Sequence, residues 1–205
     1  MLFSAISFGC CIMYAVRFYK NLFTDEGYIT WTLPASPLTQ LWAKILSASI
    51  WYVLDLIICF AAAWFLISGD NIQSALERIK PDFQAALGMS FSSFCGLVVF
   101  FSFVGILSCV LFIYTSIAIG QLVPAHRIIV SIAVYFILNL ITQIISIGVS
   151  IITSVFPDYV FSPAQTSFSE YFFQMLLIGT CTTTVLAIAG YFITYRILQR
   201  NVNLI

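Results

Sequence analysis

Long apolar stretches separated by short polar segments run through the whole chain. The stretches cover about residues 1–16, 45–67, 87–116, 128–155 and 173–198. An α-helix needs roughly 20 apolar residues to cross about 30 Å of hydrocarbon, and its backbone groups must bond within the helix because lipid offers no water. The pattern therefore predicts an all-α transmembrane fold, a bundle of five membrane-spanning helices in a single domain over residues 1–205.

The polar segments between these stretches carry signals for helix ends. Ser36 is a suitable N-cap and Pro37 suits the first helical position, so the second helix should begin there and continue directly into its span. The third helix should extend beyond the bilayer and end near Gly120. Apolar positions within residues 71–83 share one helical face, which predicts a short interfacial helix.

Composition supports a membrane location and argues against other classes. Of the 205 residues, 61% are hydrophobic and 8% are charged, whereas a soluble domain carries about 25% charged residues. The formal net charge is zero, and nucleic-acid binding needs clustered Lys and Arg. We therefore expect a lipid bilayer around the chain and no nucleic-acid partner.

The basic residues set the expected orientation, because Lys and Arg concentrate in cytoplasmic loops. One side of the membrane would hold Arg17, Lys20, Lys44, Arg127, Arg196 and Arg200, and the other side Arg78 and Lys80. The loop over residues 17–44, the loop around His126 and the C-terminus are thus predicted to be cytoplasmic.

Enzymatic chemistry has little support in the sequence. The six cysteines include no CxxC pair, the single histidine, His126, has no second ligand nearby, and no GxxxxGK[ST] phosphate loop occurs. Hydrolysis inside a bilayer would need a paired acid, a Ser–His couple or a metal, but Asp55 is the one acidic residue within the spans. We expect no catalytic residue, no metal and no cofactor bound by this chain.

Polar residues inside the spans are candidates for function. Asp55 lies near the middle of the second span, where an ionisable group is by default a functional candidate; alternatively it is protonated and hydrogen-bonded between helices. Polar residues also recur along one face of the fourth span, at Ser131, Tyr135, Asn139, Gln143, Ser146 and Ser150. That face should point inward, where it either lines a translocation path or makes interhelical hydrogen bonds. The candidates for the path are Asp55, Tyr135, Asn139, Gln143 and Ser146.

Small residues form two further stripes, which predict close helix packing. On the third span they are Gly88, Ser92, Cys95, Ser102, Gly105 and Cys109, and on the fifth Gly179, Thr183, Ala187, Gly190 and Thr194.

The most informative segment is the run Asp-Glu-Gly-Tyr-Ile-Thr-Trp-Thr-Leu-Pro-Ala-Ser over residues 25–36. Taken alone, Tyr28, Trp31 and Trp42 suit an aromatic belt at headgroup level. With Lys44-Ile45-Leu46 after it, the run resembles the permease subunits of bacterial type-2 ABC exporters, especially small permeases with a DEGY-x-T-x-TLP-x-S run. Weaker likeness comes from residues 119–122 with 126–128, and from 195–204, so the resemblance covers nearly the whole chain.

This resemblance implies a fold of six spans, one more than the pattern predicts, with a first helix missing from this sequence. It implies a permease that couples ATP hydrolysis by a separate ATPase subunit, which binds ATP and Mg, to alternating access. The partners would be that ATPase and a second permease copy or a sister permease, in the bacterial plasma membrane. The implied ATPase contacts are Asp25, Glu26, Gly27, Tyr28, Thr30, Trp31, Thr32, Leu33, Pro34 and Ser36, with His126 and Arg127 in a second loop. The alternative function is a non-transporting membrane partner, such as an immunity or sensor subunit.

Overall fold

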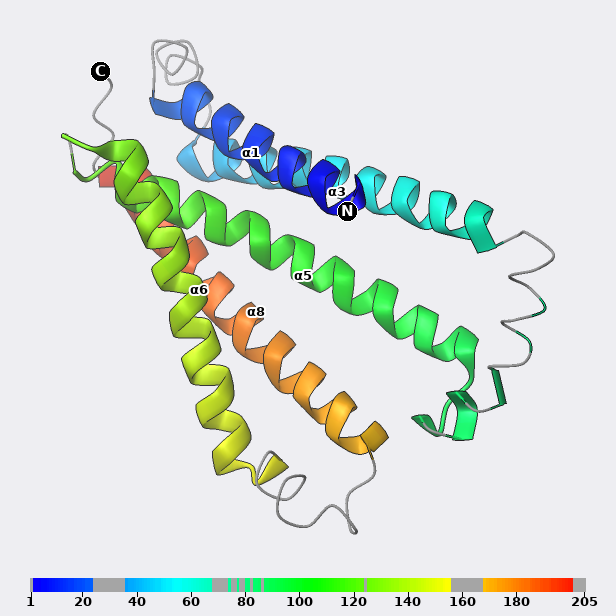
Figure 1. Ribbon diagram of the computed structural model, residues 1–205. Coiled ribbons are helices and arrows are strands. Elements are labelled where there is room, and N and C mark those ends of the chain that lie inside the picture. The colour runs from blue at the N-terminus through cyan, green and yellow to red at the C-terminus, as the bar shows by residue number, and fades with distance from the viewer. Residues whose placement is uncertain are drawn as a thin grey trace. The chain divides into compact units, whose positions relative to one another are not determined.

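The computed structural model is built from long helices (Figure 1). It describes residues 2–23, 36–67, 74, 77, 80, 81, 83–85, 87–123, 125–155 and 168–200, and no strand occurs among these residues. In chain order the helices are α1 (Leu2–Phe23), α3 (Pro37–Ile67), α5 (Phe91–Gly120), α6 (Arg127–Ile152) and α8 (Phe168–Arg200).

Four of the described helices, α3, α5, α6 and α8, are long and apolar enough to cross a membrane. Only 11–17% of the residues in the most apolar window of each are buried, so large apolar side chains such as Phe65, Phe136 and Ile152 remain on the outer surface. Exposed surfaces of this kind are stable in lipid and unfavourable in water. The chain is therefore a multi-pass membrane protein. The expected count of five spans is not confirmed, because α1, which carries Arg17 and Lys20 near its end, is not among the four.

Serine caps fix where two of these helices begin. The Thr39 backbone N–H donates to Ser36 Oγ at 3.2 Å, which confirms Ser36 as N-cap and Pro37 as the first residue of α3. Ser90 caps α5 in the same way, through a bond of 3.3 Å from the Ser93 N–H.

The third helix begins later than the expected residue 87. Gly88 has φ +66°, a left-handed conformation that only glycine adopts at little cost, and α5 starts at Phe91. The assignment of Gly88 to a packing stripe of this helix was therefore wrong, since Gly88 lies in the turn before it. The expected end at Gly120 is confirmed.

The last two helices also differ from their expected bounds. Ser154 adopts φ 60°, and α6 ends before it, at Ile152. The final helix starts at Phe168 rather than near residue 173, with Glu170 in its first turn, where a carboxylate interacts favourably with the helix dipole.

Packing divides the described helices into two units, with boundaries inside α3, α5, α6 and α8. The first unit contains Met1–Asp55, Ile106–Ile141 and Val185–Ile205, and the second contains Leu56–Gly105 and Thr142–Thr184.

The buried hydrophobic core belongs to the first unit and joins α1, α3, α5 and α8. Its members are Tyr14, Phe18, Leu22, Phe23, Leu41, Ile45, Ala48, Tyr52, Val110, Ile113, Tyr114, Ile117 and Leu198. At its centre Phe18 stacks on Tyr114 with ring centroids 3.8 Å apart and planes 11° from parallel. Helices α5 and α8 approach closely in this unit, where Thr194 Oγ1 donates to Thr115 Oγ1 at 3.2 Å. Gly190 and Thr194 thus belong to a packing stripe, as expected.

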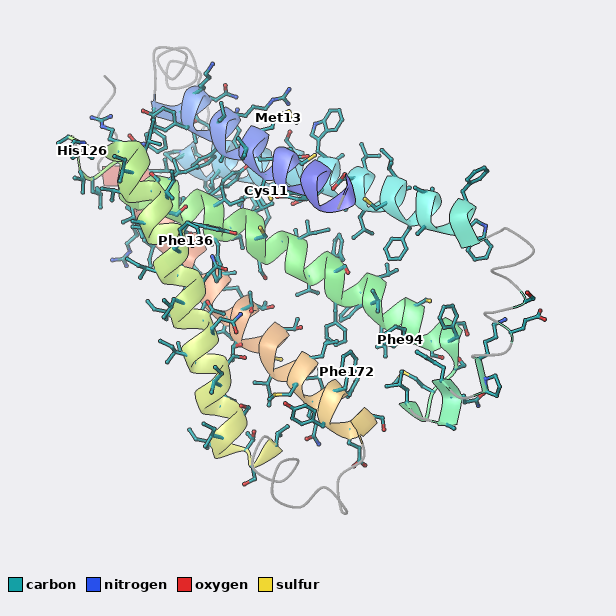
Figure 2. The ribbon with its side chains drawn as sticks, viewed as in Figure 1. Cys11, Met13, Phe94, His126, Phe136 and Phe172 are labelled. Carbon is teal, nitrogen blue, oxygen red and sulfur yellow. The ribbon has the colours of Figure 1, made fainter. Side chains whose placement is uncertain are left out.

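The second unit is held together by aromatic contacts. Phe83 meets Phe94 with ring centroids 5.2 Å apart, and Phe94 of α5 meets Phe172 of α8 at 6.4 Å (Figure 2). One interhelical hydrogen bond of this unit joins Thr182 of α8 to Ser146 of α6, at 3.4 Å.

Candidate functional site

The residues on either side of the segment predicted to contact an ATPase are buried. Asp25, Glu26, Gly27, Tyr28, Thr30, Trp31, Thr32, Leu33 and Pro34 lie outside the described residues. The flanking residues are described: Leu22 and Phe23, at the end of α1, are fully buried, and Leu41, one turn into α3, is 1% exposed. Both ends of the loop are therefore anchored in the core of the first unit.

The second predicted contact, at His126 and Arg127, lies in the short connection between α5 and α6. Backbone bonds from Leu122 to Ile119 and from Val123 to Gly120 form a tight turn after α5. Arg127 Nη1 donates to Gln121 Oε1 at 3.2 Å, which closes the connection from the other side. His126 is exposed at the start of α6 (Figure 2).

Two donors in this connection lack an acceptor within the described part of the chain. Gln121 Nε2 and Arg127 Nε are buried there and have no hydrogen-bond partner. A buried donor without a partner costs about 1–3 kcal/mol, so an acceptor placed here would be stabilising.

The polar face of α6 points inward over most of its length. Ser131 and Ser150 are buried, and Tyr135, Asn139 and Ser146 are half-buried. Gln143 is exposed instead, and its neighbour Thr142 occupies the buried position. The inward orientation expected for Gln143 was therefore wrong, because the helix is rotated so that residue 142 faces its neighbours.

Hydrogen bonding on this face is largely local. Ser131 Oγ donates to the Arg127 carbonyl at 2.8 Å, and Asn139 Nδ2 donates to the Tyr135 carbonyl at 2.8 Å. Ser146 accepts the interhelical bond from Thr182. The sequence left two interpretations of this face open, a translocation path and interhelical hydrogen bonding. One interhelical bond, between Ser146 and Thr182, supports the second. The Ser131 hydroxyl and the Asn139 amide are instead satisfied by carbonyl groups within α6.

Asp55 of α3 is half-buried and lies near Cys11 and Tyr14 of α1.

A cluster of thiol and phenol groups lies close to this carboxylate. Cys11 Sγ of α1 is hydrogen-bonded to the Tyr52 hydroxyl of α3, and Cys109 of α5, like Cys11 a free thiol, lies next to Cys11 and to Tyr135 of α6. The cluster links four helices of the first unit. No pattern in the sequence indicates this cluster, because its members are far apart along the chain and belong to no motif. Within the described residues, no group of three or more His, Cys, Asp and Glu side chains could hold a metal ion.

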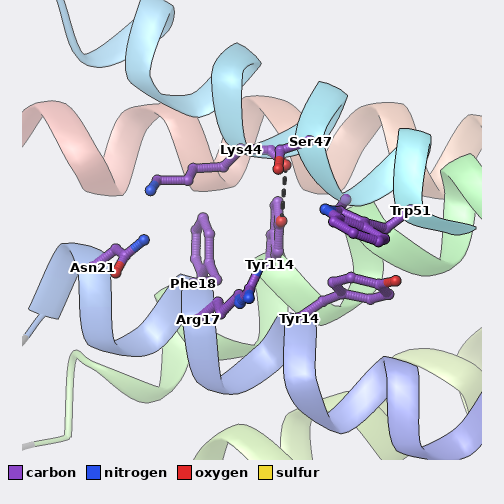
Figure 3. Close-up of a pocket in the computed structure, with 9 residues that line it drawn as sticks. Tyr14, Arg17, Phe18, Asn21, Lys44, Ser47, Trp51 and Tyr114 are labelled. Atoms are coloured by element: carbon purple, nitrogen blue, oxygen red, sulfur yellow. Dashed lines mark hydrogen bonds between the residues drawn. The ribbon is translucent and has the colours of Figure 1, made fainter.

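A pocket of about 90 Å³ opens between α1, α3 and α5 (Figure 3). Arg17 and Lys44 both line it, together with Tyr14, Phe18 and Trp51. The hydroxyl of Tyr114, another lining residue, donates to the Lys44 carbonyl at 3.1 Å. The sequence suggested cytoplasmic positions for Arg17 and Lys44, but gave no signal that they share a pocket.

Comparison with known proteins identifies no relative. No family model matches the chain, and no curated protein or solved structure matches it.

Proposed function

We propose that this protein is the permease subunit of an ATP-driven ABC exporter in the bacterial plasma membrane. The proposal rests on the DEGY-x-T-x-TLP-x-S run over residues 25–36 and on the four apolar helices of a multi-pass membrane protein. The positive-inside rule puts that run and the C-terminus in the cytoplasm, where an ATPase subunit would be found.

The anchoring of the 24–35 loop is the structural observation that carries this proposal. A loop that transmits force must be attached rigidly, because a soft attachment would absorb the displacement. Phe23, the last residue of α1, is 0% exposed, and Leu41 in the second turn of α3 is 1% exposed. Interiors packed to this extent transmit strain, so movement of the loop would be passed to α1 and α3 together.

The α5–α6 connection suits a second contact with the same partner. It is short, internally bonded from Arg127 to Gln121, and presents the exposed His126.

In this function the chain performs no hydrolysis. Two ATPase subunits close on ATP and Mg, their movement reaches the permease through the two loops, and two permease copies, or this chain and a sister permease, alternate between inward-open and outward-open states. Asp55, Tyr135, Asn139 and Ser146 are the candidates for the path, and the exposed Gln143 would reach it only through the second permease subunit.

The test is purification of the full chain from its native membrane in mild detergent, followed by identification of co-purifying proteins and an ATPase assay. We expect an ATP-hydrolysing subunit to accompany the wild type. Leu33→Asp and Gly27→Pro should abolish its binding while the permease is still inserted. Leu38→Asp, five residues beyond Leu33 in the first turn of α3, is the matched control and should retain the ATPase.

Failure of any ATPase to co-purify, under conditions that preserve other exporters, would contradict the proposal. Equal retention in all variants would instead remove residues 25–36 as the contact. A non-transporting membrane partner is the second candidate, favoured by the satisfied polar groups of Ser131 and Asn139 on α6, which need no transport path to explain them.

A further inference from the structure

We propose that the pocket between α1, α3 and α5 binds the phosphate of an anionic phospholipid from the surrounding bilayer. The pocket is bounded by Arg17 and Lys44, with Tyr14, Trp51 and Tyr114 among its walls (Figure 3). This inference goes beyond the exporter function and does not depend on it.

Charge is the first argument. Two lining side chains, Arg17 and Lys44, are cationic, Asn21 and Ser47 add neutral polar groups, and none of the lining residues that the structure describes is acidic. Such a set is suited to an anion. Guanidinium and ammonium groups both bind phosphate oxygens, and basic pockets between membrane helices on the cytoplasmic side are typical sites for phospholipid headgroups.

Size is the second argument. One water molecule needs roughly 10–15 Å³ of such space, so a volume of about 90 Å³ is sufficient for a small anionic group such as a phosphate.

The walls are fixed before a ligand arrives. Tyr114 is held by its stacking on Phe18 and by its hydroxyl bond to the Lys44 carbonyl. Tyr14 contacts Tyr52, with ring centroids 4.7 Å apart. A preformed site loses less conformational entropy on binding than a flexible one.

The outer surface next to the pocket favours a lipid over free phosphate. Val16 of α1, beside Arg17, is exposed, as are Ile50 and Leu54 of α3, which follow Ser47 at helical spacing. Acyl chains would cover these side chains while the phosphate occupies the pocket. Trp51, another lining residue, is half exposed, and tryptophan side chains favour positions between headgroups and hydrocarbon.

The experiment measures lipid binding to the full chain in detergent by native mass spectrometry, with phosphatidylglycerol as the probe. Arg17→Gln with Lys44→Gln should weaken binding roughly thirtyfold, since each basic residue near the surface contributes about 1 kcal/mol to anionic-lipid attraction. The control is Lys20→Gln with Arg196→Gln, which removes one Lys and one Arg outside the pocket and should bind as the wild type does.

A second pair of variants tests the pocket without changing its charge. Ser47→Phe should fill the space and weaken binding, whereas Ser47→Ala should not. The Ser47 variants also test the proposal if the Arg17→Gln, Lys44→Gln double variant does not fold. Circular dichroism and size-exclusion chromatography would reveal such a folding defect.

Three results would overturn the proposal. If the two double variants lose phosphatidylglycerol binding equally, the lipid is attracted by the general surface charge of the protein and not by the pocket. Phosphatidylcholine that binds as tightly as phosphatidylglycerol would show that the anion is not recognised. Displacement of the lipid by inorganic phosphate at similar concentration would identify free phosphate as the ligand.

Discussion

Gly190 of α8 lies directly against Thr115 of α5. A methyl group added at Gly190 would stand 2.6 Å from Thr115 Oγ1 and 3.4 Å from Thr115 Cβ. The first distance is well below van der Waals contact, so one of the two helices or the threonine side chain would have to move. Helices α5 and α8 are therefore packed as closely here as a residue without Cβ permits.

The first prediction concerns this contact. Gly190→Ala should lower the free energy of unfolding by about 1–3 kcal/mol through overpacking. The clash involves one hydroxyl, so Thr115→Ala should restore much of the loss, although it removes the bond from Thr194, worth about 0.6 kcal/mol. A double-mutant cycle, measured by SDS-induced unfolding in mixed micelles, should show strong non-additivity.

Gly105 supplies the control for that cycle. A Cβ added there would meet nothing within 4 Å, so Gly105→Ala should leave stability unchanged or raise it by up to about 1 kcal/mol. If Gly190→Ala changes the free energy of unfolding as little as Gly105→Ala does, α5 and α8 do not approach closely at Gly190.

The second prediction concerns Gly120, at the end of α5. An added Cβ would clash with the Ser131 hydroxyl and lie 2.9 Å from both the Arg127 carbonyl oxygen and the Ser131 backbone nitrogen. Backbone atoms at the start of α6 cannot rotate away. Gly120→Ala should therefore destabilise the protein by more than about 2 kcal/mol, and Ser131→Ala should not rescue it. Rescue by Ser131→Ala in the same unfolding assay would show that the side chain, and not the backbone, makes the contact.

The third prediction concerns the start of α3. Ser36→Ala should cost about 1 kcal/mol, because the Thr39 N–H loses its acceptor. Ser36→Asp keeps an acceptor and places a negative charge at the helix N-terminus, so it should retain wild-type stability. Equal behaviour of the two variants in thermal unfolding would contradict the cap.

The fourth prediction compares a core and a surface phenylalanine. Phe18 is 1% exposed and stacks on Tyr114, so Phe18→Ala should destabilise the protein by about 3–5 kcal/mol. Phe136 is 66% exposed on α6 (Figure 2), so its environment should change little on folding in a membrane. Phe136→Ala should therefore change the unfolding free energy by less than about 1 kcal/mol. Similar losses of unfolding free energy in both variants would show that Phe18 does not belong to the core.

Much of the helical architecture could be predicted because its signals are local. Ser36 and Pro37 act within one turn, and the end of α5 at Gly120 follows from residues next to it. The start of α5 was misplaced because Gly88 can be either a helix residue or a left-handed turn, and its φ of +66° depends on the chain around it.

The candidate site was less predictable from the same information. A polar residue every third or fourth position defines a face about a third of the helix wide, but it does not fix helix rotation to one residue. Gln143 was expected inside, yet Thr142 is buried and Gln143 is exposed. The difference arises from contacts with neighbouring helices, which periodicity does not contain.

Apolar length, scarce charge and helix caps determine from the sequence alone that this chain forms long helices suited to a membrane, because these properties act within one segment. Contacts between distant segments were decided by tertiary structure. Cys11 meets Tyr52, Tyr114 meets the Lys44 carbonyl, and Thr194 meets Thr115, across 41, 70 and 79 residues of sequence. In a chain where most residues are apolar, many helix pairings satisfy hydrophobicity equally well. Steric fit at small residues and a few polar contacts therefore select the pairing, and they exist only once the helices have assembled.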